Sequence, residues 1–581
     1  MGKQWYRNVM TATVLALGLL VSGCAVGRGS SARGTKPVAV EIPEPLDIAS
    51  PQVVGYLVVP DLEATMDHIE EIAAAFAPDK VQPGMLKGQL GQVLGDPNLV
   101  YLDEAMPLVV MLLRSDTPTE PPPVVGCMSY TKEQPYAETA ERWGVASRIG
   151  EDVLMVSNTS DTLDAAEALI PLYRKIRTAA ITSDVRVTFY MRHLTDIYGS
   201  TVRAWLDRMV GSLGALAAMS QPGGGPNQSA WLAKILRLEM NALLAVLADI
   251  EVVQSDVSFN TEALTIDRIA VARHGSRLED LFNSPAVGEN YAVGLLSEPG
   301  FLMYAAQVDP KRLSNFVVEV LRKLSEDPEA AEILTPEVVA LYEDMDTWLT
   351  GDMAVSMRSI GELPFVSETA MGVRDAAKSL AMVERGMSLV APGGPFDKLY
   401  QEMGTDISTA LEKDVRYRAG LPVHRVKIAM EMPTAPEGWA THMKGMMKDT
   451  EFAFAGGYYL AAQDATALNS SIDRALADVR TDALTFHARD LFGPGQHVYG
   501  DLDVVGLMKA FAAAVPPGMP NQLKPLVEQV SCTEPIAFVM AVSGGRARAQ
   551  ARVPLSPFMQ MVAAARESGR GHGAKPTSGG E

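Results

Sequence analysis

The chain has 581 residues, of which 47% are hydrophobic and 21% charged, and its formal net charge is −20 at pH 7. These proportions are typical of a folded globular protein and exclude a chain that is disordered throughout. The strong negative charge opposes binding to phosphate backbones, so the sequence indicates no nucleic-acid partner.

The N-terminus has the three-part layout of an export signal. Lys3 and Arg7 supply positive charge, a mostly apolar run extends from Val9 to Val21, and two small residues then precede Cys24. The apolar run is too short to cross a bilayer, for which about 20 apolar residues are needed. We therefore predict that residues 1–23 are a signal peptide that is removed.

The five residues LVSGC that end at Cys24 resemble the lipobox of bacterial lipoproteins. The resemblance implies that Cys24 becomes the lipid-modified first residue of the mature chain, carrying two or three acyl chains that together form a stable membrane anchor. Residue 25 is Ala rather than Asp, which by resemblance to lipoproteins of two-membrane bacteria favours the outer membrane. The alternative is an ordinary signal followed by an unrelated cysteine. The body is similar in composition to large uncharacterised envelope lipoproteins, and no specific family motif matches it.

Both ends of the mature chain are rich in small and polar residues. Residues 24–50 contain many Gly, Ser, Pro and Ala residues, which predicts a lipidated flexible tether. Residues 568–581 have the same character and are predicted to form a disordered tail. No apolar stretch of membrane-spanning length follows the signal, so the expected membrane contact is the lipid on Cys24.

Between these ends, short β-like runs alternate with amphipathic helical stretches. Extended or β-branched runs predict strands at Val53–Val59, Leu108–Leu113, Val124–Ser129, Val185–Met191, Ile266–Ala272, Ala292–Leu296, Met353–Met357, Val423–Met430, Phe452–Leu460 and Ile536–Val542. Helical periodicity predicts helices at Leu62–Phe76, Ser200–Leu213, Ala230–Leu247, Pro310–Leu324, Pro336–Leu349, Ala465–Ala477 and Val504–Ala514. Asp residues at strand-to-helix turns, namely Asp61, Asp161, Asp196, Asp464 and Asp503, are expected to cap helices or form turns.

Three pairs of segments indicate an internal duplication. The segments near 149–170, 185–210 and 263–282 parallel, in the same order, those near 456–476, 496–515 and 535–561. The predicted architecture is α+β: two tandem lobes, 51–285 and 289–565, each an antiparallel sheet with helices packed on one face. The second lobe is longer, so an insertion is expected near 360–425.

Two cysteines remain besides Cys24. An exported compartment permits a disulfide between Cys127 and Cys532, and two separately buried thiols are the alternative.

Motifs for catalysis are scarce. The sequence contains no nucleophile elbow, zinc-helix motif, phosphate-binding loop, dinucleotide fingerprint or CxxC pair. Its one S-x-x-K match, Ser129 to Lys132, lacks the companion motifs of penicillin-binding enzymes. No catalytic residue, metal site or cofactor is predicted.

Two weaker patterns have competing interpretations. His487 and His497 with Asp490 would suit a metal or acid/base cluster, whereas solvated loop histidines are favoured. The methionines between 430 and 447 would suit Cu(I), whereas filling of the core is favoured.

These observations favour a non-enzymatic envelope lipoprotein that binds or scaffolds an unidentified ligand or envelope protein. A carrier of lipid or another apolar ligand in the periplasm is the second hypothesis. An envelope hydrolase whose site is assembled from distant residues is the third.

Overall fold

In the computed structural model of the protein, strand β1 (Val53–Val59) is buried at all but one of its residues. Its sequence, VVGYLVV, is an almost continuous apolar run, as expected of a strand covered on both sides. Helix α2 (Leu62–Phe76) follows and is capped by Asp61, whose carboxylate accepts a 2.9 Å hydrogen bond from the Ala64 N–H. Both elements have the bounds predicted from the sequence.

The structure describes residues 40–573 apart from gaps. The gaps are 47–49, 51, 79, 95–98, 100–101, 116–121, 131–145, 151–152, 158, 202–203, 205–207, 209–225, 362, 398–400, 402–405, 432–448, 478–485, 516–520 and 522. The signal peptide and Cys24 lie outside the described residues.

The chain divides into two compact units, each made of three segments. Unit 1 comprises Met1–Ile42, Trp205–Asp249 and Ala272–Ala547, and unit 2 comprises Pro43–Ala204, Ile250–Val271 and Arg548–Glu581. Residues 205–249 therefore belong to unit 1 and residues 548–581 to unit 2. The lobes predicted from the sequence, 51–285 and 289–565, placed these segments the other way round.

Unit 2 contains an antiparallel sheet. After β1, its strands are β2 (Leu108–Leu113), β3 (Val124–Met128), β4 (Ala146–Gly150), β5 (Val153–Ser157), β6 (Val185–Tyr190), β7 (Ile250–Phe259) and most of β8 (Ala263–Ala272) and β18 (Arg546–Pro554). The pairing order is β4–β5–β3–β2–β1–β6–β7, and β8 pairs with β18.

Helices cover both faces of this sheet. On one face, Tyr56, Met111 and Met155 pack with residues of α5 (Ser160–Glu167) and α6 (Ile170–Arg177). On the other face, Val59 and Leu154 pack with residues of α2 and α3 (Met85–Leu94). Helices on one face were predicted, and the buried, non-alternating sequence of β1 explains why unit 2 needs cover on both.

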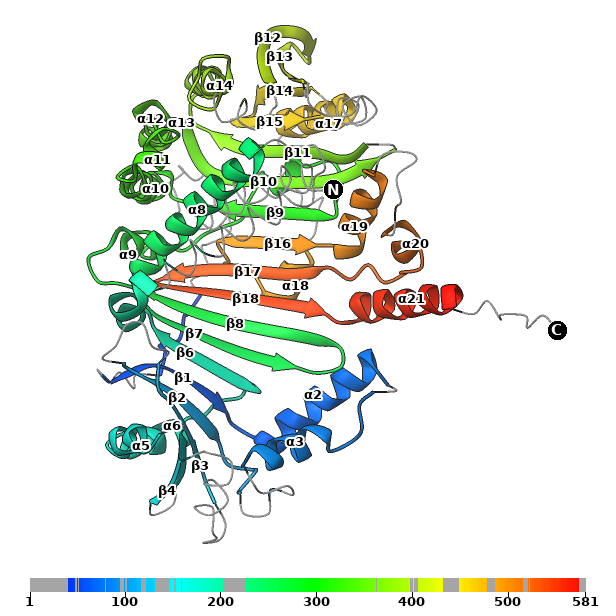
Figure 1. The fold of residues 1–581 in the computed structure, drawn as a ribbon. Helices are drawn as coiled ribbons and strands as arrows, with labels where there is room; N and C mark the ends of the chain where they lie inside the picture. Colours follow the sequence, from blue (N-terminus) through cyan, green and yellow to red (C-terminus); the bar gives the residue numbers. More distant parts are fainter. Residues whose placement is uncertain are drawn as a thin grey trace, which may run out of the picture. The chain divides into compact units, whose positions relative to one another are not determined.

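Unit 1 also contains a run of paired antiparallel strands. Its strands are β9 (Leu302–Gln307), β10 (Leu349–Ile360), β11 (Leu363–Val373), β12 (Asp406–Arg418), β13 (Leu421–Glu431), β14 (Thr450–Ala455), β15 (Tyr458–Ala462), β16 (Val498–Leu502) and β17 (Ile536–Ser543). They pair in the order β12–β13–β14–β15–β11–β10–β9–β16–β17, and Figure 1 shows β9 between β10 and β16.

The strands of the two units pair in the same order. The order β14–β15–β11–β10–β9–β16–β17 repeats β4–β5–β3–β2–β1–β6–β7, strand for strand along the chain. The predicted α+β fold with a duplicated sheet is therefore confirmed. The insertion expected near 360–425 corresponds to α14 (Ala376–Val390) and the β12–β13 hairpin, which lie between β11 and β14 along the chain.

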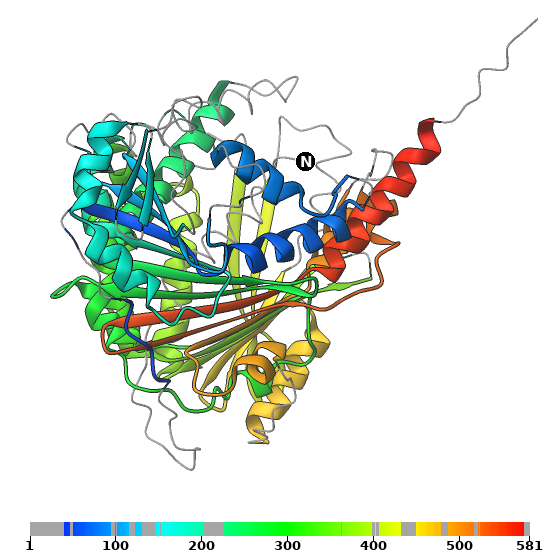
Figure 2. The same ribbon diagram turned by 90° about the horizontal axis from the view of Figure 1, so that it is seen from below.

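The remaining helices of unit 1 flank this sheet. They are α8 (Pro226–Ala248), α9 (Arg277–Phe282), α10 (Pro310–Leu324), α11 (Pro328–Ala331), α12 (Pro336–Glu343), α13 (Met345–Trp348), α17 (Ala465–Leu476), α18 (His487–Phe492), α19 (Val504–Ala513) and α20 (Leu523–Val527). Figure 2, where α17 is gold, shows this helix on one side of the strands of its own unit, where it contacts β14 and β15.

Several predicted elements were wrong. Residues 292–296 contain a short 3₁₀ turn rather than a strand, and the segment Phe452–Leu460 is a hairpin that turns at Gly456 and Gly457. The predicted helix Pro336–Leu349 is divided into α12 and α13, and the predicted strand Ile266–Ala272 begins earlier, at Ala263. Most of the predicted helix Ser200–Leu213 lies outside the described residues.

Some described residues of the predicted tether and tail contact the body. Ile42 is buried, and the Leu46 N–H donates a 3.2 Å hydrogen bond to Gln254. Helix α21 (Ser556–Gly573) continues into the expected tail, and the Arg566 guanidinium donates to the Phe76 carbonyl oxygen.

Candidate functional site

Helix α17 begins where its sequence predicts. Asp464 caps it by accepting 3.3 Å hydrogen bonds from the N–H groups of Thr466 and Ala467. One face of the helix is buried, through Ala467, Leu468, Ser471 and Ile472. The opposite face is polar, so α17 joins the core of unit 1 to a hydrophilic surface.

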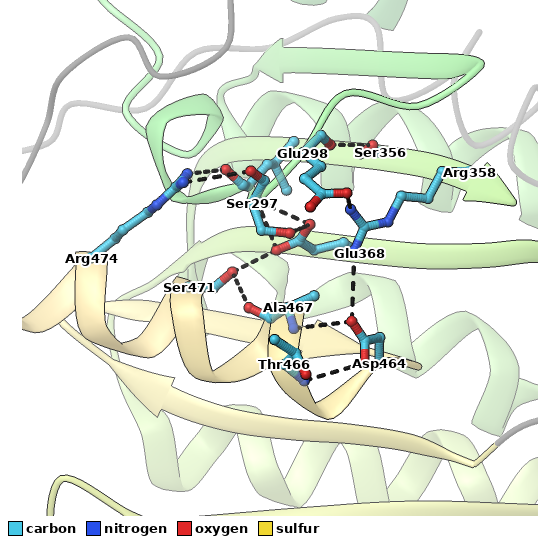
Figure 3. A network of polar contacts seen from close by, with 11 residues as sticks. Ser297, Glu298, Ser356, Arg358, Glu368, Asp464, Thr466, Ala467, Ser471 and Arg474 are labelled. Atoms are coloured by element: carbon cyan, nitrogen blue, oxygen red, sulfur yellow. Dashed lines mark hydrogen bonds and ion pairs between the residues drawn. The ribbon is translucent and has the colours of Figure 1, made fainter. Parts of the chain in front are cut away.

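A buried carboxylate lies beneath this helix (Figure 3). Glu368 on β11 has only 4% of its surface exposed. Both of its oxygens accept 3.0 Å hydrogen bonds from the Ser297 N–H, and its carboxylate also accepts from the hydroxyls of Ser297 (2.7 Å) and Ser471 (2.6 Å). Because an unpaired buried carboxylate is very costly, these donors are what makes its burial tolerable.

Arg474 on α17 hydrogen-bonds to the loop that contains Ser297. Its guanidinium donates to the carbonyl oxygens of Leu296 and, at 3.5 Å, Ser297. Ser297 therefore contacts Glu368 through its N–H and hydroxyl, and Arg474 through its carbonyl (Figure 3). The result is a fixed connection between β11, the loop and α17.

Arg358 adds a second connection. It pairs with Glu298 in the same loop and lies 3.8 Å from the carboxylate of Asp464, the residue that caps α17. The Glu298 carbonyl in turn accepts a 3.0 Å hydrogen bond from the Ser356 hydroxyl. Polar groups thus hold the N-terminus of α17 as well as its middle.

The outward face of α17 lines an open depression of ≈ 580 Å³, which we call the α17 depression. Its lining residues are Thr466, Asn469, Ser470, Asp473, Arg474 and Ala477 from the helix, and Arg418 from β12. The helix residues recur at steps of three and one, so they form a single stripe along α17. The volume lies in the range of sites for small ligands.

The inserted hairpin supplies the second arginine. Arg416 and Arg418 are two residues apart on β12 and so share one side of the strand. Arg416 donates to Asn469 (2.7 Å) and Glu451 (2.8 Å), and Arg418 donates through Nε to Asp473 (3.0 Å). The insertion therefore forms one wall of the α17 depression.

Charge in the depression is positive on balance. The charges of Arg418 and Asp473 cancel. Their hydrogen bonds raise the pKa of Arg418 and lower the pKa of Asp473, so both side chains stay ionised. In the described part of the chain, Arg474 hydrogen-bonds to the carbonyl oxygens of Leu296 and Ser297 and forms no ion pair with a carboxylate. The described lining residues include two arginines and one aspartate, which give a net charge of +1 in a chain whose net charge is −20.

The cysteines are not bridged. Cys127 is a free thiol, buried in the unit 2 core on β3, and burial raises its pKa to about 12. Cys532 belongs to unit 1. The structure thus has separate thiols in place of the Cys127–Cys532 disulfide considered from the sequence.

Both ring nitrogens of His497 lie within hydrogen-bonding distance of backbone groups. The Val542 N–H donates to Nδ1 of His497 (3.3 Å), and Nε2 of His497 lies 3.3 Å from the Pro285 carbonyl oxygen. The ring is therefore neutral, with its proton on Nε2, and burial lowers its pKa to about 4. His497 is buried rather than solvated, and in the described part of the chain no three His, Cys, Asp or Glu side chains could hold a metal ion.

The other sequence candidates are described only in part. The Ser129 hydroxyl is buried and lies 3.3 Å from the Tyr173 hydroxyl, while Lys132 falls outside the described residues. The methionine side chains between 430 and 447 also fall outside them. Asp61, Asp464 and Asp503 cap helices as predicted, whereas Thr159 rather than Asp161 caps α5, and Asp196 lies within a helix, 3.8 Å from Arg192.

Sequence reasoning did not single out Glu368, Arg418 or Arg474. One signal was present for Glu368, because buried residues alternate along β11 and place Glu368 in the inward row. A charged residue in an inward row indicates a buried polar network. Nothing local distinguishes Arg418 or Arg474 from the many solvated arginines of the chain.

Comparisons with models of protein families, with curated proteins and with solved structures each found no match. Within the described part of the chain, no helix has the length and apolar character needed to cross a bilayer.

Proposed function

We propose that the protein is a lipid-anchored binding module of the bacterial cell envelope. The signal layout and the LVSGC sequence ending at Cys24 support export and lipid attachment. Ala25 supports delivery to the outer membrane in a host with two membranes. The anchor holds the folded body at the membrane surface, where the body binds its ligand or envelope partner.

The α17 depression is the observation that carries the binding role. It combines polar side chains of α17 with Arg418 of the inserted hairpin. The Ser471–Glu368 and Arg416–Asn469 hydrogen bonds hold the helix against its neighbours. Pre-positioned polar groups reduce the entropy that binding costs. Six of its seven described lining residues have polar side chains, which favours a ligand with polar groups over a wholly apolar one.

Membrane fractionation tests the anchored state. We expect the wild type, expressed in a two-membrane bacterium, to sediment with outer membranes and Cys24→Ala to leave that fraction. Cys532→Ala is the matched control, since it removes a thiol from the mature body and should fractionate as the wild type does. Identical fractionation of wild type and Cys24→Ala would overturn the proposal.

A further inference from the structure

We infer that the α17 depression binds a carbohydrate bearing an oxyanion, that is, a phosphorylated or carboxylated sugar. This inference rests on the proposed function, because it names the ligand class of the same depression. It follows from the charge of the lining, the hydrogen-bond donors that remain there, and the length of the polar stripe.

The lining of the depression carries a local positive charge. Arg418, Asp473 and Arg474 give the lining a net charge of +1, although the whole chain carries −20. At physiological ionic strength the screening length is about 8 Å, so the charges of the lining dominate the field that a bound group experiences. The depression therefore attracts an anion that most of the surface repels.

The remaining donors select an oxyanion. A guanidinium has about five N–H donors, and the hydrogen bonds of Arg474 direct Nη1 and Nη2 to carbonyl oxygens, which leaves further N–H donors on the group. Arg418 uses Nε and Nη2 for Asp473, which leaves the Nη1 group for a ligand. Hydrogen bonds from a guanidinium to an ionised oxygen are stronger than those to a neutral one, so the N–H donors that remain favour phosphate or carboxylate oxygens.

The rest of the stripe adds hydroxyl and amide groups. Thr466 and Ser470 contribute hydroxyls, and Asn469, whose Oδ1 accepts from Arg416, retains its amide N–H donors. Residues 466–477 span roughly 16 Å at 1.5 Å per residue, which exceeds one oxyanion and leaves room for the sugar that carries it. None of the described lining residues is aromatic, so these residues offer no platform for stacking a nucleobase.

Both arginines are held in place before a ligand arrives. Arg474 is bound to the loop that Glu368 anchors, and Arg418 is bound to Asp473. Asp473 also weakens the binding of an anionic ligand, because its carboxylate competes for the N–H donors of Arg418 and repels negative charge. The site should therefore bind more tightly when Asp473 loses its charge.

The test is calorimetric titration of the mature lipoprotein in detergent with glucose 6-phosphate, glucuronate, glucose and inorganic phosphate. We expect the two charged sugars to bind and glucose not to bind. Arg474→Gln should weaken binding of the charged sugars by about tenfold, the effect of losing one charge-assisted hydrogen bond. Arg322→Gln, which removes an exposed arginine of α10 outside the lining, should bind as the wild type does.

Asp473→Asn provides a gain-of-affinity variant at an exposed position, and we expect it to bind the charged sugars about threefold or more tightly. It keeps the test decisive should Arg474→Gln fail to fold. Absence of binding by both charged sugars, or weaker binding by Asp473→Asn, would overturn the inference. Inorganic phosphate binding as tightly as glucose 6-phosphate would overturn the carbohydrate component.

The two proposals fail separately. None of these variants alters the signal or Cys24, so membrane fractionation should be unchanged by them. Loss of sugar binding with normal fractionation contradicts only the ligand class, whereas a soluble wild type that still binds charged sugars contradicts only the anchor.

Discussion

Glu368 on β11 accepts a 2.6 Å hydrogen bond from the hydroxyl of Ser471 on α17, 103 residues further along the chain. The bond joins a sheet strand to the helix that lines the α17 depression. It belongs to a set of donors, with the Ser297 N–H and hydroxyl, that surrounds one buried carboxylate. The stability of unit 1 should therefore depend on the charge of this side chain.

Glu368→Gln should destabilise the protein by about 2 to 3 kcal/mol, because an amide N–H₂ would face donors that now bind a carboxylate oxygen. Ser471→Ala should cost about 1 kcal/mol through the loss of one donor. Urea unfolding would measure both. Glu343→Gln, at an exposed pair with Arg322, is the control and should change stability by less than about 1 kcal/mol. A Glu368→Gln protein as stable as this control would contradict the structural role of the network.

His497 should make stability fall in acid. Burial lowers its pKa from 6.5 to about 4, so between these values the unfolded chain takes up a proton that the folded chain refuses. The stabilisation is complete above pH 6.5 and is lost as the pH falls towards 4, by about 3 kcal/mol in total. In His497→Gln, the pH dependence of urea unfolding should be flatter by that amount. Parallel curves for the two proteins would show that His497 ionises normally in the fold.

Gly351 should not tolerate a side chain. Its φ is +106°, and an added Cβ would lie 1.8 Å from the Val308 carbonyl oxygen. Gly351→Ala should therefore cost about 2 kcal/mol or more. Gly386 in α14 has open space around it, so Gly386→Ala should stabilise the protein by about 0.5 to 1 kcal/mol. Thermal unfolding of the pair compares them, and a harmless Gly351→Ala would mean that the β10 backbone follows another path.

Cys127 should resist alkylation in the native protein. Its thiol is buried and its pKa is raised to about 12, so little thiolate forms at neutral pH. Peptide mapping after treatment with iodoacetamide should find Cys127 unmodified until the protein is unfolded. Rapid native labelling would show that β3 is exposed, and recovery of a peptide linked to Cys532 would restore the disulfide.

The sequence was most informative where local chemistry and periodicity coincide. Helices α2 and α10 were predicted with their observed bounds, because Asp61 and Asp309 cap amphipathic stretches. The apolar run Ala292–Leu296 was misread, since five apolar residues fit a strand or a turn of helix equally well. Cover on both faces of the unit 2 sheet was also missed, although β1 does not alternate.

The candidate site depends on contacts that one sequence does not show. Arg474 and the Leu296 carbonyl are 178 residues apart, and Arg418 reaches Asp473 only because the inserted hairpin packs beside α17. The duplication was detectable because the two copies repeat their order of elements. The depression lies where an insertion unique to one copy meets the repeated helix, so the repeat itself did not reveal it.

The most direct test of the account is the intact mass of the protein extracted from membranes. We predict a mass that lacks residues 1–23 and includes two or three acyl chains on Cys24, with no such addition in Cys24→Ala. A wild-type mass equal to that of the unprocessed chain, or of a cleaved chain without acyl groups, would contradict the lipid anchor on which the proposed function depends.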